Sequence, residues 1–127
     1  MAATLILNVD DVPTHRYAKT RILQHAGYEV VETGTGAETL QLVNELRPDL
    51  VLLDLNLPDM NGMEVCSAIK ATRLGSRIPV VHISATSVGA EYEMASLEHG
   101  GDVYLPQPVG PQTLLTVVGV LLRLRKT

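Results

Sequence analysis

Short runs of aliphatic residues alternate with longer amphipathic stretches along the whole chain. The short runs predict strands, and the nearly continuous apolar runs at 5–9 and 50–53 are typical of strands buried on both faces of a parallel sheet. The predicted strands are residues 4–9, 28–32, 50–53, 79–83 and 102–105. The stretches between and after them predict helices at residues 13–26, 36–46, 62–73, 88–98 and 111–125. Five successive strand–helix units indicate an α/β fold, in which helices cover both faces of a parallel sheet.

Carboxylates follow the first and the third predicted strands. Asp10 and Asp11 come directly after one strand, and Asp54 follows the other. Because the carboxyl ends of parallel strands meet at one edge of a sheet, where ligands bind in open α/β folds, we expect these side chains to lie together. Two such charges about 4 Å apart repel by roughly 4 kcal/mol at an effective dielectric near 20. A divalent cation relieves this repulsion, and Mg²⁺ suits oxygen ligands.

Two of these aspartates also have a purely structural explanation. Asp11 precedes Val12-Pro13 and could cap the first helix, and Asp54 could be a turn residue before Pro58. A cap accounts for one residue of the Asp10-Asp11 pair and leaves the other unexplained. The joint placement of the three residues therefore favours a binding site.

The fourth and fifth strands end in further polar groups. Ser84 follows the fourth strand, and we expect its hydroxyl to enter the same crevice. The fifth strand leads into Pro106-Gln107-Pro108, where proline enforces a tight turn and permits a cis peptide bond. Together these positions bring carboxylates, a hydroxyl and an amide to one edge of the sheet.

The composition narrows the class of protein. A length of 127 residues suits a single domain spanning residues 1–127. The net charge of −4 argues against direct binding of nucleic acid. No apolar run reaches the ~18 residues of a membrane-spanning helix, and the N-terminus lacks the layout of a signal peptide, so we expect a cytoplasmic protein without membrane contact. The single Cys66 excludes an internal disulfide, and we expect it to be buried. The four histidines are scattered and predict no site.

The last predicted helix is unusually apolar. Nearly every residue from 114 to 124 is aliphatic, so an apolar face packed on the sheet leaves Leu115, Val120 and Leu124 without an evident partner. The helix is either buried on all sides or forms a surface for a partner or a homodimer. The sequence leaves both alternatives open.

Several motifs taken together identify a family. They are Val9-Asp10-Asp11, the run PDLVLLDLNLPDMNG at 48–62, the Ser84-Ala85 step and the run GDVYLPQP at 101–108. With them the chain resembles, over its whole length, a receiver (response-regulator) domain of bacterial two-component signalling. The resemblance implies a doubly wound, flavodoxin-like sheet of five parallel strands in the order 2-1-3-4-5. It also implies a regulatory phosphoacceptor rather than an enzyme that turns over a substrate.

The resemblance assigns roles to the acidic residues. Asp54 is implied to be the phosphoacceptor, which takes a phosphoryl group from the phosphohistidine of a sensor histidine kinase or a phosphotransfer protein. Asp11 and Asp54 are implied to bind Mg²⁺ together with the backbone carbonyl of Asn56, with Asp10 assisting through water.

The resemblance also implies a switch. Ser84 matches the hydroxyl that moves onto the phosphoryl group, and Tyr104 matches the aromatic side chain that turns inward with it. Asn56 and Thr86 occupy positions that tune the lifetime of the phosphoryl group in the family.

One position departs from the family pattern. A lysine usually precedes the last proline of the fifth loop, and here that residue is Gln107. A charge-assisted hydrogen bond from the lysine is worth roughly 1.5–3 kcal/mol, and glutamine is shorter and neutral. No basic residue near Gln107 in sequence replaces it. We expect weaker coupling to the output surface and greater dependence on a divalent cation. The alternative is a pseudo-receiver, which acts as a phosphorylation-independent interaction module.

Two further features bear on partners. The Gln107-Pro108-Val109 ending and the Arg16-Tyr17 pair resemble receivers attached to sensor histidine kinases, so the chain could be the N-terminal module of a hybrid kinase. The expected contact surface is the face formed by the fourth helix, the fifth strand and the fifth helix. It includes Val88, Tyr92, Tyr104 and Leu115.

Two other functions fit the residues less well. Phosphatases with an aspartate nucleophile carry a second aspartate two positions later, where this chain has Asn56. A nucleotide site at Gly34-Thr35-Gly36 lacks the third glycine of its motif, and a helix-entry turn explains these residues better.

Overall fold

The computed structural model describes residues 3–84 and 90–125, with residues 90–92 described by their backbone alone. Five parallel strands form one sheet in the order β2-β1-β3-β4-β5. The strands are β1 (Leu5–Val9), β2 (Glu29–Thr33), β3 (Leu50–Asp54), β4 (Val80–Ser84) and β5 (Val103–Pro106). This topology confirms the predicted α/β fold and its flavodoxin-like strand order.

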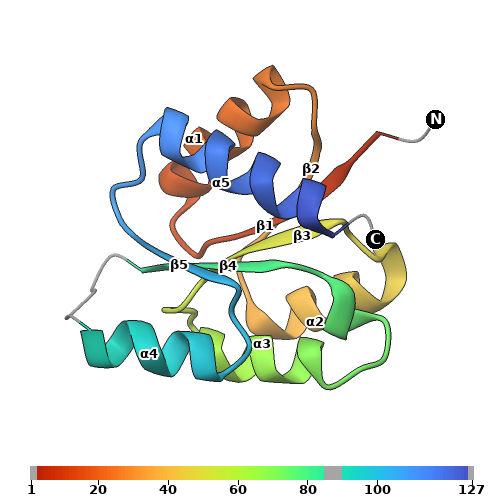
Figure 1. Cartoon of the computed structure of the whole chain (residues 1–127), viewed down its shortest axis with the longest axis vertical. Helices are drawn as coiled ribbons and strands as arrows, with labels where there is room; N and C mark the ends of the chain where they lie inside the picture. The colour runs from red at the N-terminus through yellow and green to blue at the C-terminus, as the bar shows by residue number, and fades with distance from the viewer. Residues whose placement is uncertain (1–2, 85–89, 126–127) are drawn as a thin grey trace.

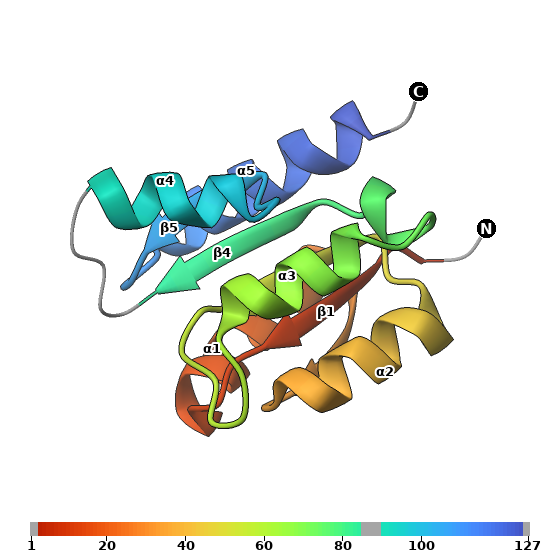
Figure 2. The same ribbon diagram turned by 90° about the horizontal axis from the view of Figure 1, so that it is seen from below.

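Helices cover both faces of the sheet. They are α1 (Pro13–His25), α2 (Gly36–Leu46), α3 (Gly62–Lys70), α4 (Ala90–Glu98) and α5 (Pro111–Leu124), with a short 3₁₀ helix at Gly75–Arg77. α1 and α5 lie on one face, whereas α2, α3 and α4 lie on the other (Figures 1 and 2). The sheet is therefore the central layer of three.

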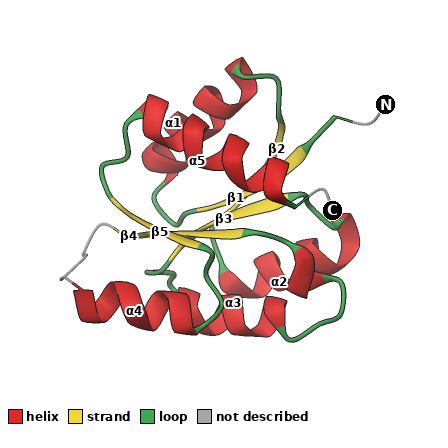
Figure 3. Ribbon diagram, viewed as in Figure 1, coloured by secondary structure: helices red, strands yellow, loops and turns green. Residues whose placement is uncertain are grey.

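The predicted elements are all found (Figure 3). Apart from the start predicted for the fourth helix at residue 88, which lies outside the described residues, most bounds agree within two residues. The exception is α3, which ends at Lys70 rather than at residue 73. The hydroxyl of Thr72 donates to the carbonyl of Ile69 at 2.9 Å and accepts the N–H of Gly75 at 2.9 Å, which turns the chain out of the helix. A Cβ at Gly75 would lie 2.1 Å from the Ile69 carbonyl oxygen, so only glycine fits this turn.

The core is aliphatic, and the alternation of strand side chains divides it between the two faces of the sheet. On the α1/α5 face, Leu23, Leu114 and Val118 pack on strand residues such as Leu50 and Leu52. On the opposite face, Val43, Val65, Cys66 and Ile69 pack on strand residues that include Val51 and Leu53. Cys66 is fully buried, as predicted, and burial raises the pKa of its thiol to about 11.

The outer face of α5 is partly apolar and exposed. Leu115 is half-buried and packs on the core, so the expectation that it lacks a partner is wrong. Val120 is 37% exposed and Leu124 is 70% exposed, so α5 is not buried on all sides. Val88 and the Tyr92 side chain, both expected at the contact surface, lie outside the described residues. Thr86, at a position that tunes the lifetime of the phosphoryl group in the family, also lies outside them.

Candidate functional site

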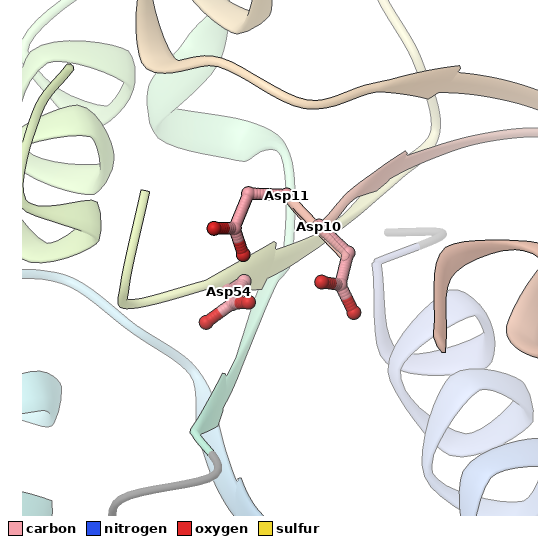
Figure 4. A group of neighbouring side chains, drawn as sticks. All are labelled: Asp10, Asp11 and Asp54. Atoms are coloured by element: carbon pink, nitrogen blue, oxygen red, sulfur yellow. The ribbon is translucent and has the colours of Figure 1, made fainter. Parts of the chain in front are cut away.

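The parallel sheet brings three aspartates together at its carboxyl edge. Asp10 and Asp11 follow β1, Asp54 ends β3, and β1 and β3 are hydrogen-bonded neighbours. One carboxylate oxygen of each residue lies within 4.8 Å of the others, and the three side chains face a common space (Figure 4). Asp10 and Asp54 are buried, and Asp11 is exposed. Within the described ranges, no other set of acidic, histidine or cysteine side chains is close enough to hold a metal ion.

Two short turns orient the buried carboxylates. Asp10 Oδ1 accepts the backbone N–H of Val12 at 2.9 Å, and Asp54 Oδ1 accepts that of Asn56 at 2.9 Å. Each hydrogen bond holds one oxygen of its carboxylate. The residue that caps α1 is Val12, and no side chain caps this helix, so the alternative of Asp11 as a helix cap is wrong.

Burial dominates the electrostatics of Asp54. The residue is 6% exposed, and burial is the main reason that its pKa rises to about 6. The N–H of Asn56 opposes this rise, the neighbouring charge of Asp10 adds to it, and the ammonium of Lys19 lowers the pKa again. Concentrated negative charge with oxygen ligands is the environment that a hard divalent cation occupies.

Lys19 is a residue of this site that the sequence reasoning missed. Its Nζ lies 3.0 Å from Oδ2 of Asp10, and the two side chains are 9% and 0% exposed. No basic residue lies near Gln107 in sequence, and the ammonium beside Asp10 comes from α1 instead. Helical spacing could have indicated that Lys19 is buried, since it lies four positions before the apolar Leu23 and thus on the same, inner face of the helix.

Polar contacts fix the turn of α1 that carries Lys19. The buried side-chain amide of Asn8, in β1, donates to the Arg16 carbonyl at 2.9 Å and to the Thr20 hydroxyl at 3.0 Å. Arg16 in turn donates to the carbonyl of Asp10 at 2.7 Å and pairs with Glu32 at 2.9 Å. These contacts hold α1 against the end of β1 on either side of Lys19.

The other predicted residues lie at the ends of β4 and β5. Ser84 is fully buried, and its carbonyl accepts the backbone N–H of Gln107 at 2.9 Å. The peptide bond between Gln107 and Pro108 is cis. Tyr104 is buried and packs with Leu55 and Met63, so its ring is turned inward in this structure.

The loop after β3 is tied to α2 by Asp59. The two carboxylate oxygens of Asp59 accept the N–H groups of Gly36 at 2.8 Å and Ala37 at 2.9 Å, and these bonds lower the pKa of Asp59. Thr35 caps the same helix by accepting the N–H of Glu38. The Gly34-Thr35-Gly36 segment is thus a helix-entry turn, and a carboxylate of the chain itself fills the place that a phosphate would need.

Comparison with known proteins shows the family of this chain. The family model described as "Response regulator receiver domain" matches residues 6–119. The chain is 40% identical over 118 residues to the DNA-binding response regulator MtrA of Mycolicibacterium smegmatis. The aligned region covers 93% of this chain and 50% of the relative. The chain belongs to the response regulator receiver domain family.

Solved receiver structures are similar over nearly the whole domain. A putative response regulator from Chloroflexus aurantiacus superposes with a TM-score of 0.91 at 30% identity, covering 96% of this chain and 99% of the other. The signal receiver domain of a histidine kinase from Syntrophus aciditrophicus gives 0.89 at 31% identity, covering 98% and 93%. This receiver domain is therefore a regulatory module of two-component signalling.

The receiver domain spans about half the length of the curated relatives it matches. In the part of the chain that the structure describes, no helix has the length and apolar character needed to cross a bilayer. The acidic cluster of Asp10, Asp11 and Asp54 could hold a metal ion, in keeping with the family.

Proposed function

We propose that this receiver domain takes a phosphoryl group onto Asp54 in a Mg²⁺-dependent reaction and relays it through a conformational switch. The donor is the phosphohistidine of a sensor histidine kinase or a phosphotransfer protein. The observation that carries the proposal is the buried Asp54, whose carboxylate faces those of Asp10 and Asp11 within 4.8 Å.

The environment of Asp54 suits a phosphoacceptor. A carboxylate is a weak nucleophile, but phosphoryl transfer depends mainly on placement of the reacting groups and on neutralisation of the phosphoryl oxygens. The hydrogen bond from the Asn56 N–H holds one oxygen of Asp54 and leaves the other to attack. Because Asp54 is 6% exposed, little water can compete with the donor.

The donor set fits Mg²⁺. Asp11 and Asp54 would hold the ion with the backbone carbonyl of Asn56, and Asp10 would assist through water. Bound there, Mg²⁺ supplies the positive charge that neutralises the phosphoryl oxygens. The exposed Asp11 leaves an open side from which the ion and the phosphodonor can enter.

Ser84 and Tyr104 are the proposed switch. The Ser84 hydroxyl would engage the phosphoryl oxygens, and its carbonyl is already bonded to the Gln107 N–H. A shift of Ser84 would therefore move the β5–α5 loop and bias the packing of Tyr104 on Leu55. The face of α4, β5 and α5 is the proposed output surface, and α5 is the proposed site of homodimer contact.

The covalent context of the domain is also a proposal. The relative MtrA is named as DNA-binding and is about twice as long, whereas the Syntrophus aciditrophicus structure is a receiver of a histidine kinase. Attachment to a hybrid kinase remains our interpretation of Gln107-Pro108-Val109. The net charge of −4 supports a receiver module that does not itself contact nucleic acid.

Intact-mass spectrometry after incubation with Mg²⁺ and acetyl phosphate tests the function. We expect one added phosphoryl group that disappears in Asp54→Asn and in the absence of Mg²⁺. Asp49→Asn is the matched control, because Asp49 lies at the opposite end of β3 and pairs with Arg125. No adduct with acetyl phosphate or a kinase would favour the pseudo-receiver, and steady turnover of a phosphate ester would favour a phosphatase.

A further inference from the structure

Lys19 is the buried cation of the acidic cluster. Its ammonium lies 3.0 Å from Asp10 Oδ2, and its side chain is 9% exposed although it belongs to a helix that faces solvent on its other side. A lysine is rarely buried to this extent without a function or a full set of partners. Neither Lys19 Nζ nor Asp10 Oδ2 makes a hydrogen bond of good geometry within the described residues, so the contact is an ion pair with donors to spare.

Lys19 also lies beside the position from which the family's lysine is missing. Lys19 and Gln107 line one cavity of about 430 Å³ between α1 and the β5–α5 loop, together with Ile22 and Pro108. The ammonium that reaches Asp10 therefore comes from α1, while Gln107, which lines the same cavity as Lys19, is neutral. Its charge acts on Asp54 as well as on Asp10.

We propose that Lys19 supplies the positive charge of the phosphorylation pocket, pairing with Asp10 in the resting domain and with the phosphoryl group on Asp54 after transfer. This inference rests on the proposed function and names a residue of the same site. The spare N–H groups of Lys19 are the donors that phosphoryl oxygens would accept, and Asn8 holds the adjacent turn of α1 in place.

The transfer step leaves Lys19 chemically unchanged. A carboxylate oxygen of Asp54 forms a bond to phosphorus, and the bond between phosphorus and the acetate oxygen of acetyl phosphate breaks. Acetate leaves with the electron pair of that bond. The ammonium keeps its proton throughout and acts only by attracting the charge on the phosphoryl oxygens.

The position of the cation decides which element of the fold contacts the phosphoryl group. A lysine at position 107 would link the phosphoryl group to the β5–α5 loop, whereas Lys19 links it to α1. Lys19 also competes with a metal ion for the charge of Asp10, because both are cations within reach of the same carboxylate. Removing Lys19 should therefore strengthen Mg²⁺ binding while it slows phosphoryl transfer.

The test compares Lys19→Met with the wild type and with Lys19→Met/Gln107→Lys, all checked for folding by circular dichroism. We expect Lys19→Met to be phosphorylated by acetyl phosphate roughly 10- to 100-fold more slowly at saturating Mg²⁺, the range of a lost charge-assisted hydrogen bond. Its Mg²⁺ affinity should rise by about 3- to 10-fold, since a neighbouring positive charge is gone. The double variant, which returns an ammonium from the other side of the cavity, should recover most of the rate.

Arg21→Met is the matched control, because it removes one positive charge from the exposed side of α1. Its rate and Mg²⁺ affinity should equal those of the wild type. A folded Lys19→Met protein with a wild-type rate would overturn the inference, as would a double variant no faster than Lys19→Met. If the wild type itself takes no phosphoryl group, the proposed function fails instead.

A variant-free measurement covers the case in which Lys19→Met does not fold. The ammonium resonance of Lys19 in the wild type can be followed by NMR while Mg²⁺ and beryllofluoride, a mimic of the phosphoryl group, are added. We expect this resonance to shift when beryllofluoride is added to the Mg²⁺-loaded protein. An unchanged resonance, with Asp54 shown to be occupied, would overturn the inference.

Discussion

Asp59 Oδ1 accepts a hydrogen bond from the N–H of Gly36 at 2.8 Å, and this bond joins the loop after the proposed phosphoacceptor to the first turn of α2. A second bond from Ala37 at 2.9 Å makes the contact bidentate. The start of a helix favours a negative charge, so the contact combines hydrogen bonding with the helix dipole. The position of the loop that carries Asn56 thus depends on a residue beyond the acidic cluster.

Asp59→Ala is expected to lower the melting temperature at pH 7. The pKa of Asp59 is below its usual value of 3.8, so its stabilising effect is fully present above that pH. The effect is lost as the pH falls through the lowered pKa of the folded protein. Thermal unfolding of both proteins at pH 7 and near pH 3 should show a difference that shrinks in acid. An equal difference at both pH values would mean that the charge of Asp59 has no part in it.

Asp54→Asn is expected to stabilise the metal-free protein. The substitution removes a buried charge that is repelled by Asp10, while the amide keeps the shape of the side chain. We expect a gain of about 1–3 kcal/mol in the free energy of unfolding at pH 7.5 with EDTA. Urea titrations with and without Mg²⁺ measure it, and Mg²⁺ should narrow the gap by stabilising the wild type.

Asp11→Asn is the control for that experiment. Asp11 belongs to the same cluster but is exposed, so solvent already screens its charge. Asp11→Asn should raise the free energy of unfolding of the metal-free protein by less than Asp54→Asn does. Equal gains from the two variants would contradict burial as the cause.

His82 is expected to make the domain sensitive to mild acid. Its imidazole is fully buried in β4, where Nδ1 contacts the hydroxyl of Ser96, and burial lowers its pKa from 6.5 to about 4. The unfolded chain takes up a proton below pH 6.5 while the folded protein stays neutral. The contribution of His82 is therefore complete above pH 6.5 and is lost as the pH falls towards 4.

The comparison that isolates His82 uses His82→Leu, which has no group to titrate. Over this window we expect the wild type to lose up to about 3 kcal/mol more than the variant. Urea unfolding of both proteins at pH 7.5, 5.5 and 4.5 provides the measurement. Parallel losses in the two proteins would assign the acid sensitivity to other residues.

Leu115 and Leu124 provide a paired test of α5. Leu115 packs on the core, so Leu115→Glu should lower the free energy of unfolding by about 2–3 kcal/mol. Leu124 is 70% exposed, and Leu124→Glu should stay within about 0.5 kcal/mol of the wild type. Size-exclusion chromatography with light scattering adds the oligomeric state. A molar mass in solution that is lower for Leu124→Glu than for the wild type, at unchanged stability, would support a homodimer surface on α5. An unchanged molar mass would exclude Leu124 from such a surface.

The sequence by itself determined the layers of this protein and the place of its acidic residues. Aliphatic runs bounded by glycine and proline specify buried parallel strands, because only such segments can be covered on both faces. Once β1 and β3 are neighbours, Asp10, Asp11 and Asp54 must meet at one edge, whatever the detail of packing. The sequence pattern predicted the end of α3 less well, since that end depends on the local hydrogen bonds of Thr72.

Only the tertiary structure decided the partner of Asp10. The sequence pointed to an absent lysine at 107, and proximity in sequence gave no sign of Lys19, which lies 88 positions earlier on another element. The direction of the Lys19 side chain depends on how α1 is rotated against β1, and the hydrogen bonds of Asn8 to Arg16 and Thr20 set that rotation. Helical spacing says which residues share a face, but packing decides which charge that face meets.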